Sequence, residues 1–192
     1  MSMNQSNEAA RAAAVDDGSS LARRIYDTSH LSGEFTLRSG AVSNEYFDKY
    51  RFESDPVLLR EIAAGMVDML PEGVQALAGL ELGGVPLATV ASQISGLPAL
   101  FVRKQAKTYG TCRLAEGGGL AGRRLAVFED VVTSGGQVIE SCAQLRALGA
   151  EIVVVLCVID RQAGGAERMA AEGLALRSLF TMSQLGEAAG GA

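Results

Sequence analysis

The sequence is poor in histidine and cysteine, and this scarcity argues against several kinds of site. Its single histidine, His30, has no second histidine with which to build a histidine-based metal site, so we expect it to be structural. The three cysteines, at positions 112, 142 and 157, are odd in number and lack C-x-x-C spacing, which disfavours a disulfide framework and a zinc site. The sequence therefore predicts a cytoplasmic protein whose side chains form no dedicated metal site.

Long apolar runs and a strong positive charge are also missing. No stretch approaches the roughly 18 apolar residues that a membrane helix requires, and the N-terminus lacks the charged start and apolar core of a secretory signal. The formal net charge is -5, and neither a basic nucleic-acid-binding face nor a helix-turn-helix extension is apparent. We therefore expect a soluble protein that binds neither membranes nor nucleic acid.

The length of 192 residues suits one domain. Residues 1–18 are rich in alanine, serine, asparagine and aspartate, which is typical of a disordered tail. No repeat or linker divides the rest of the chain. We predict a disordered tail over residues 1–18 and a single domain over residues 19–192.

Short apolar runs alternate with helical patterns, which indicates an α/β fold. The expected strands cover residues 34–37, 45–52, 76–80, 98–102, 125–128 and 152–159, and the expected helices cover residues 21–28, 55–70, 86–95 and 136–148. Ser54 as cap and Pro56 in the first turn begin the second helix. Because several strands are almost purely apolar, we predict a mostly parallel central sheet flanked by helices. Ligands of such sheets bind beyond the carboxyl ends of the strands.

The most informative stretch is LAVFEDVVTSGGQ, residues 125–137. A short apolar strand is followed by an acidic pair, Glu129 and Asp130, and by a TSGG loop, residues 133–136, that opens a helix. The two glycines let backbone N–H groups turn inward beside the unpaired donors of the helix start, so the loop can bind a phosphate. The acidic pair can accept hydrogen bonds from neighbouring hydroxyls, which suggests a phosphorylated sugar. An ordinary strand-to-helix turn with two solvated acids is the alternative.

Two further segments are candidates for binding anions. The ELGG loop, residues 81–84, also joins a strand to a helix, and its glycines can direct backbone donors at an anion; a plain tight turn is the alternative. The basic segment, residues 103–113, holds four bases and no acid, followed by glycines that permit motion. It is either a solvated face or a mobile loop that docks on an anionic ligand.

The strand, acidic pair and TSGG loop resemble the phosphoribosyl diphosphate motif of the type I phosphoribosyltransferases. Between residues 35 and 185, five motifs resemble those of the orotate phosphoribosyltransferases and follow the same order: FTLRSG, GLELGGVPLA, FVRKQAKTYGTCRLAEGG, the acidic motif and Asp160-Arg161. The resemblance implies the type I phosphoribosyltransferase fold with a small N-terminal hood. It also implies transfer of ribose 5-phosphate from 5-phospho-α-D-ribose 1-diphosphate (PRPP) to orotate, giving orotidine 5-monophosphate and pyrophosphate in pyrimidine synthesis.

The same resemblance implies a role for each motif. Glu129 and Asp130 hold the ribose hydroxyls. The residues that wrap the 5-phosphate are Val131, Val132, Thr133, Ser134, Gly135, Gly136 and Gln137. The catalytic cations that meet the pyrophosphate, in a homodimer whose loops reach the partner's site, are Arg103, Lys104 and Lys107. The residues that bind orotate are Thr133, Arg161 and, as a lesser contributor, Arg38. Mg2+ accompanies the diphosphate and is held mainly by substrate oxygens and water.

Two positions depart from the family pattern, and two other functions stay open. Arg38 stands where many bacterial members have lysine, and Tyr109 stands where they have histidine. Arg38 keeps a positive charge, whereas Tyr109 cannot supply an imidazolium, which argues against protonation of the leaving group by residue 109. The alternatives are a purine phosphoribosyltransferase, which shares the acidic motif, and a non-catalytic regulator that senses PRPP. Arg161 has an alternative too, namely an ion pair with Asp160 or a surface acid.

Overall fold

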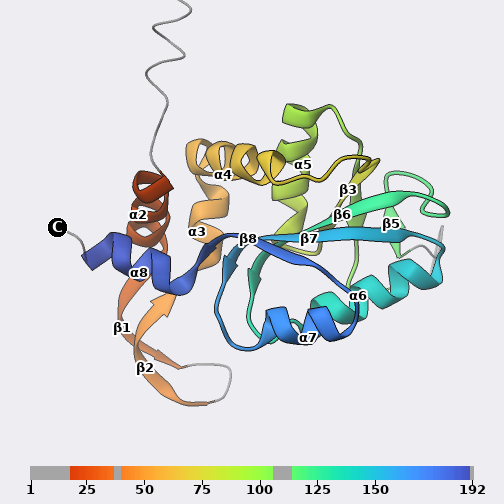
Figure 1. Cartoon of the computed structure of the whole chain (residues 1–192). Helices are drawn as coiled ribbons and strands as arrows, with labels where there is room; N and C mark the ends of the chain where they lie inside the picture. The colour runs from red at the N-terminus through yellow and green to blue at the C-terminus, as the bar shows by residue number, and fades with distance from the viewer. Residues whose placement is uncertain (1–17, 37–39, 106–113, 191–192) are drawn as a thin grey trace, which may run out of the picture.

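A six-stranded sheet forms the centre of the protein (Figure 1). The computed structural model describes residues 18–36, 40–105 and 114–190. The sheet strands are β3 (Ala76–Leu80), β4 (Ala99–Val102), β5 (Ala115–Glu116), β6 (Arg124–Val132), β7 (Glu151–Asp160) and β8 (Leu176–Thr181). They lie in the order β5-β4-β3-β6-β7-β8, and all neighbours are parallel except β4 and β5. This arrangement confirms the predicted mostly parallel α/β fold.

Helices cover both faces of this sheet. Those above it in Figure 1 are α4 (Pro56–Asp68) and α5 (Gly84–Ser95), and those below it are α6 (Gly136–Ala147) and α7 (Gly165–Ala171). Because side chains alternate along a strand, Phe128 of β6 packs in the upper core and Val127 packs in the lower core. No helix within the described ranges is long and apolar enough to cross a bilayer.

A small hairpin stands beside the sheet (Figure 1). The hairpin consists of β1 (His30–Thr36) and β2 (Val42–Phe47). Together with the preceding helix α2 (Gly18–Ser29) and the C-terminal helix α8 (Met182–Gly190), it forms one small unit. β1 and β2 pair antiparallel with each other, and Arg23 of α2 donates a hydrogen bond to Ala189 O of α8 at 2.9 Å. This unit is the small N-terminal hood that the resemblance implies. The predicted tail lies outside the described residues apart from Gly18, which begins α2.

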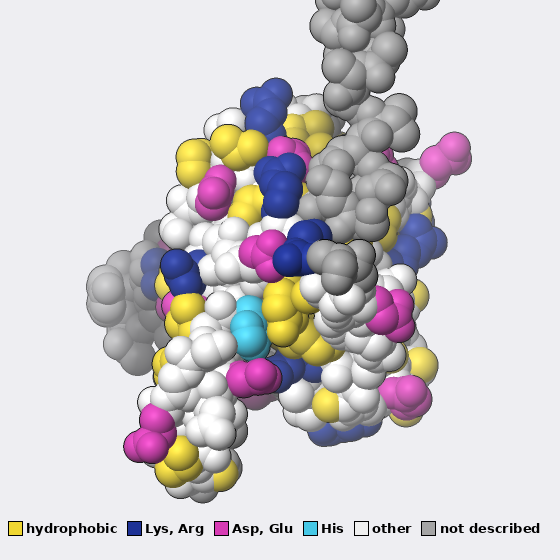
Figure 2. Space-filling model, turned by 90° about the vertical axis from the view of Figure 1, so that its left-hand side faces the viewer, with side chains coloured by type: hydrophobic (Ala, Val, Ile, Leu, Met, Phe, Trp, Pro, Cys, Tyr) yellow, Lys and Arg dark blue, Asp and Glu magenta, His cyan; other side chains and the backbone are white. Residues whose placement is uncertain are grey.

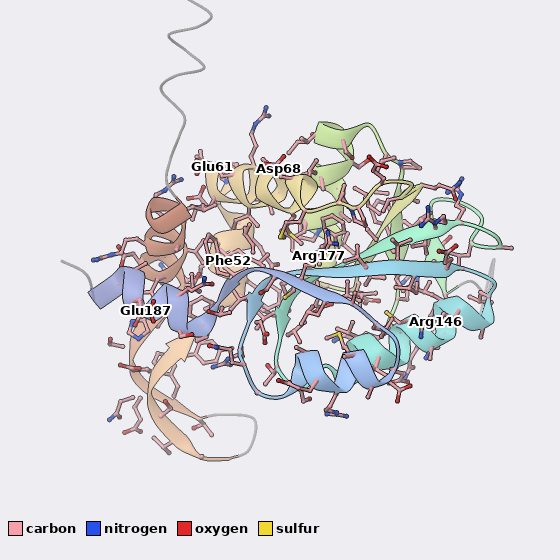
Figure 3. The ribbon with its side chains drawn as sticks, viewed as in Figure 1. Phe52, Glu61, Asp68, Arg146, Arg177 and Glu187 are labelled. Carbon is pink, nitrogen blue, oxygen red and sulfur yellow. The ribbon has the colours of Figure 1, made fainter. Side chains whose placement is uncertain are left out.

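The predicted strand over residues 45–52 is wrong in its second half. A helix, α3 (Lys49–Ser54), begins after Asp48, whose carboxylate accepts a hydrogen bond from Tyr50 N at 3.2 Å. This cap satisfies an otherwise unpaired donor of the first turn, which outweighs the strand preference of the aromatic residues. Phe52 of α3 is fully buried in the upper core (Figure 3).

The strand predicted over residues 125–128 is longer in the structure. β6 continues to Val132, and Glu129 pairs in register with Cys157 of β7. The acidic pair therefore lies within the strand and not after it, so the sheet itself fixes its backbone. Helix α6 then starts at Gly136, as predicted.

The cap of α4 is Asp55 and not the predicted Ser54. Asp55 Oδ1 accepts hydrogen bonds from Val57 N at 2.9 Å and Leu58 N at 3.0 Å, whereas Ser54 Oγ donates to Arg51 O. An ionised carboxylate is favoured at this end of a helix because it also meets the positive end of the helix dipole.

Replacing Asp55 with alanine should lower the free energy of unfolding by about 1 kcal/mol, because two first-turn donors lose their acceptor. Urea unfolding followed by circular dichroism measures the change. Ser54→Ala is the matched control and should cost less than about 0.5 kcal/mol. A larger loss in Ser54→Ala than in Asp55→Ala would contradict this assignment of the cap.

Candidate active site

The TSGG loop follows β6 and forms a turn suited to an anion. Gly135 adopts a left-handed backbone with φ 72° and is the N-cap of α6, and no side chain in the described part of the chain caps this helix. The first turn of α6 therefore keeps backbone donors for a ligand. Beside it lies a cavity of about 280 Å3, lined by Glu129 and residues 131–138. The structure thus gathers the predicted phosphate residues and one predicted ribose residue around one cavity.

The start of α7 packs closely against the TSGG loop. A methyl group on Gly165 would come within 2.6 Å of Thr133 O and 2.7 Å of Val132 Cγ1. Only glycine allows the two backbones to approach this closely. The shape of the loop therefore depends on packing between segments that lie far apart in the sequence.

The two acids of the pair have different surroundings. Glu129 lines the cavity beside the TSGG loop, whereas Asp130 is fully buried. Asp130 Oδ1 accepts a hydrogen bond from Val131 N at 2.5 Å, and Asp130 Oδ2 lies 2.5 Å from Lys49 Nζ. Burial raises the pKa of Glu129 well above its ordinary value, and the charge and hydrogen bonding of Asp130 raise this pKa further. The acidic pair therefore brings several acceptor oxygens together, and Lys49 partly neutralises its negative charge.

Two charged residues next to Asp130, Lys49 and Glu53, were not predicted from the sequence. Both come from α3, and Glu53 is only 8% exposed. Burial, followed by hydrogen bonding to Asp130 and repulsion from its charge, raises the pKa of Glu53 to about 8. The signal that would have found them is the capping residue Asp48, because once a helix starts there, residues four apart share one face.

The ELGG loop lies directly against the acidic pair. A methyl group on Gly83 would overlap Asp130 Oδ2, and one on Gly84 would overlap Phe128 O. These close approaches require glycine and place the start of α5 against the carboxyl-terminal part of β6. Gly83 is the N-cap of α5, and no described side chain caps the helix, so its first turn can also present donors to an anion. The two predicted anion loops therefore share one edge of the sheet.

The basic segment begins beside the ELGG loop. Lys104 N donates a hydrogen bond to Glu81 Oε2 at 3.2 Å, and Arg103 lines a cavity of about 210 Å3 with Glu81. The backbone of Arg103 is also held, because its N–H donates to Leu114 O at 2.9 Å. The structure therefore places two of the three predicted cations at the start of the segment, next to the ELGG loop. Four of the residues singled out in the sequence lie outside the described ranges, namely Arg38, Lys107, Tyr109 and Cys112.

Two of the predicted orotate residues lie at this edge. Arg161 follows β7, and its N–H donates to Val132 O at 2.9 Å, next to the exposed Thr133. Among the residues that the structure describes, the guanidinium of Arg161 has no ion-pair partner. The neighbouring Asp160 carboxylate instead accepts a hydrogen bond from Gln162 N at 2.8 Å. This geometry disfavours the alternative in which Arg161 pairs with Asp160 or a surface acid.

His30 and the other residue types that bind metals form no metal-binding cluster in the described part of the chain. His30, cyan in Figure 2, stacks on Tyr26 with ring centroids 4.7 Å apart, and its Nε2 lies 3.6 Å from Glu45 Oε2. It therefore packs within the hood. Over residues 18–36, 40–105 and 114–190, no three or more histidine, cysteine, aspartate or glutamate side chains are arranged to hold a metal ion. Basic and acidic side chains are interspersed on the face that Figure 2 shows.

Comparison with known proteins identifies the family. No protein-family model matches the chain. An orotate phosphoribosyltransferase from Nocardioides sp. is 53% identical over 165 residues, covering 86% of this chain and 92% of that protein. One from Methanocella arvoryzae is 44% identical over 153 residues, covering 80% of this chain and 87% of that protein.

A solved structure gives the same result. The crystal structure of Mycobacterium tuberculosis orotate phosphoribosyltransferase in complex with PRPP matches with a TM-score of 0.76 at 31% identity. The match covers 88% of this chain and 99% of that chain. The chain therefore belongs to the orotate phosphoribosyltransferase family.

Proposed function

We propose that the protein transfers the ribose 5-phosphate group from PRPP to N1 of orotate, releasing pyrophosphate and orotidine 5-monophosphate in pyrimidine synthesis. The observation that carries this proposal is the edge of the sheet where the acidic pair, the TSGG loop, the ELGG loop and the start of the basic segment meet. Each of these segments suits one part of PRPP. The sequence and structural similarity to orotate phosphoribosyltransferases supports the choice of substrates.

PRPP would lie along this edge with its 5-phosphate in the TSGG loop. Backbone N–H groups at the start of α6 would donate to the phosphate, each such bond to a charged group contributing about 1.5 to 3 kcal/mol. Glu129 and Asp130 would accept hydrogen bonds from the ribose hydroxyls. Thr133 and Arg161 would bind orotate, with Arg38 as a lesser contributor, because a guanidinium can hold a carboxylate or two carbonyl oxygens in a bidentate manner.

The basic segment would act on the leaving group. N1 of orotate loses its proton to water or to the departing pyrophosphate and forms a bond to C1 of the ribose, while the bond from C1 to the diphosphate oxygen breaks and its electron pair leaves with pyrophosphate. Positive charge builds on the sugar ring, and negative charge builds on the diphosphate. The catalytic cations Arg103, Lys104 and Lys107 would stabilise that negative charge and exclude water when the segment closes.

We also propose Mg2+ as the cofactor. Magnesium commonly bridges diphosphate oxygens and keeps several waters, so it needs few protein ligands. We expect such an ion to be held mainly by substrate oxygens and water, so that the acidic pair is left to bind the ribose hydroxyls. When bound, it would neutralise part of the charge of the diphosphate. The residues of the two loops and the acidic pair would then bind and orient the substrate around it.

The remaining proposals concern the assembly and its setting. We propose a cytoplasmic homodimer in which the basic segment of one subunit serves the site of its partner. The cysteine content of the sequence supports a reducing compartment. Residues 19–192 would act as a single domain.

A pyrophosphate-release assay with PRPP and Mg2+ tests the function. Orotate should give release well above adenine, guanine and hypoxanthine in the same assay. Preference for one of the purines would make the protein a purine phosphoribosyltransferase. Tight PRPP binding without release for any base would make it a PRPP sensor.

A further inference from the structure

Helix α3 presents two charged side chains to the acidic pair. Lys49 and Glu53 are four residues apart, so they share one face of the helix. Lys49 Nζ lies 2.5 Å from Asp130 Oδ2, with 33% of the Lys49 side chain and none of the Asp130 side chain exposed. α3 therefore supplies the counter-ion of Asp130, near the carboxyl end of β6.

The second side chain, Glu53, is enclosed at the same place. It is 8% exposed, and its Oε1 has no hydrogen-bond partner among the described residues. A methyl group on Gly83 would come within 2.8 Å of that oxygen and would overlap Asp130 Oδ2. Three segments thus meet here: α3, the ELGG loop and β6. Two of them carry motifs that the proposed function assigns to PRPP.

Lys49, Glu53, Glu129 and Asp130 form a cluster with one positive and three negative charges if every group is ionised. The charged groups that act on the Glu53 carboxyl are Lys49 of α3, Asp48 just before α3, and Asp130 on β6. The charges of the Lys49, Asp130 and Glu53 side chains also act on Glu129 of β6. Repulsion among buried carboxylates is relieved when one of them keeps a proton. Burial and Asp130 raise the pKa of Glu53 to about 8, so Glu53 is neutral at pH 7 and can donate a hydrogen bond to Asp130.

Lys49 keeps its charge in the same cluster. Burial alone would lower the pKa of Lys49, but its hydrogen bond with Asp130 and the charges of Asp130 and Glu129 outweigh burial and raise the pKa. The arrangement at neutral pH is therefore one ammonium and one protonated acid beside Asp130.

We propose that Lys49 and Glu53 are positioning residues that hold the Asp130 carboxylate for PRPP binding. This proposal rests on the proposed function, in which Asp130 meets a ribose hydroxyl. Without Lys49, Asp130 loses its counter-ion and its fixed orientation, and the edge of the sheet repels the phosphates of PRPP more strongly. Neither residue contacts the transferred group; both act through Asp130.

The first test separates PRPP binding from orotate binding. Lys49→Met should raise the KM and the calorimetric Kd for PRPP by about tenfold or more, equivalent to about 1.4 kcal/mol, and change the KM for orotate by less than about threefold. Lys49→Arg keeps the charge and should recover most of the loss. The matched controls are Arg24→Met and Glu61→Gln. These residues form a 2.8 Å ion pair between α2 and α4 and should leave both constants unchanged.

The second test uses the proton on Glu53. As the pH rises through about 8, Glu53 ionises beside Asp130, so the wild-type Kd for PRPP should rise. Glu53→Gln keeps a neutral hydrogen-bonding group and should lose this alkaline rise. Glu61→Gln should retain it.

Thermal stability gives a readout that is independent of turnover. Glu53 ionises near pH 4.5 in the unfolded chain and near pH 8 in the folded protein, so between these values the unfolded chain releases a proton that the folded chain keeps. Wild-type stability should therefore fall over this range relative to Glu53→Gln. We expect the Tm advantage of Glu53→Gln to grow by about 2 °C or more between pH 5 and pH 8.

The outcomes distinguish this proposal from the proposed function. If wild type releases no pyrophosphate with orotate, the proposed function fails. If wild type is active but folded Lys49→Met binds PRPP as tightly as wild type, the positioning role is overturned. If Lys49→Met does not fold, Glu53→Gln decides, because an unchanged alkaline rise in Kd and a Tm advantage that does not vary with pH also overturn it.

Discussion

Replacing Gly83 with alanine is expected to lower kcat/KM for PRPP by about a hundredfold or more, because small displacements of groups that position a substrate have effects of this size. A methyl group at this position would overlap Asp130 Oδ2 and come within 2.8 Å of Glu53 Oε1. Neither carboxyl can yield easily, since both are buried and Asp130 is paired with Lys49. Either the ELGG loop or the acidic pair must move. Steady-state kinetics with each substrate varied in turn measures the effect.

Gly186→Ala is the matched control for this substitution. Gly186 lies in α8, and no heavy atom of the described residues comes within 4 Å of the place that its methyl group would take. Alanine is favoured over glycine within a helix, so this variant should keep its activity and gain up to about 1 kcal/mol of stability. Wild-type kinetics in a folded Gly83→Ala protein would contradict the contact between the ELGG loop and the acidic pair.

Lys107→Ala should lower kcat by about a hundredfold to a thousandfold, the loss typical when one group that stabilises developing charge is removed. The reason is the negative charge that pyrophosphate gains as it leaves. Arg103 and Lys104, which precede Lys107 in the basic segment, already lie beside the ELGG loop. Pre-steady-state and steady-state pyrophosphate release measure the change. Turnover within a few-fold of wild type would refute a transition-state role for Lys107.

Mixing two impaired variants tests whether the basic segment crosses between subunits. Lys107→Ala lacks the cation, and Glu129→Gln lacks an acid of the pair, so neither homodimer has a complete site. If the segment serves the partner, each heterodimer has one intact site of two. Half of a statistical mixture is heterodimer, so about a quarter of wild-type activity should return. If the segment serves its own subunit, every site keeps one defect and no activity should return.

The double variant mixed with wild type provides the reciprocal comparison. It carries both Lys107→Ala and Glu129→Gln in one subunit. With a crossing segment, each site of its heterodimer with wild type contains one defect, so the heterodimers should be inactive. With a segment confined to its own subunit, the wild-type subunit should stay active in every heterodimer.

Local patterns explain which parts of the site could be predicted from the sequence. The apolar run of β6, the glycines of the TSGG loop and the start of α6 lie next to one another in the chain, so residues 125–137 predict their own structure. The ELGG loop is equally local, between β3 and α5. The parallel sheet then brings the two loops to one edge, because both follow the carboxyl ends of neighbouring strands.

The features that the sequence did not predict depend on one unrecognised helix cap and on distant contacts. The aromatic residues near Phe52 favoured a strand, and a single capping aspartate at position 48 reversed that preference. With α3 read as a strand, Lys49 and Glu53 could not be placed on one face. Their contact with Asp130 joins segments far apart in the chain, so no local pattern contains it. The full burial of Asp130 is likewise a property of the assembled sheet, helix and ELGG loop.

A crystal structure of the assembled protein with PRPP and Mg2+ bound would test the central claim most directly. We predict the 5-phosphate in the TSGG loop, the ribose hydroxyls on the acidic pair, and the diphosphate within hydrogen-bonding reach of Arg103, Lys104 or Lys107. These cations can come from the same subunit or from its partner. A bound PRPP with all three cations distant from its diphosphate in every subunit would contradict the central claim.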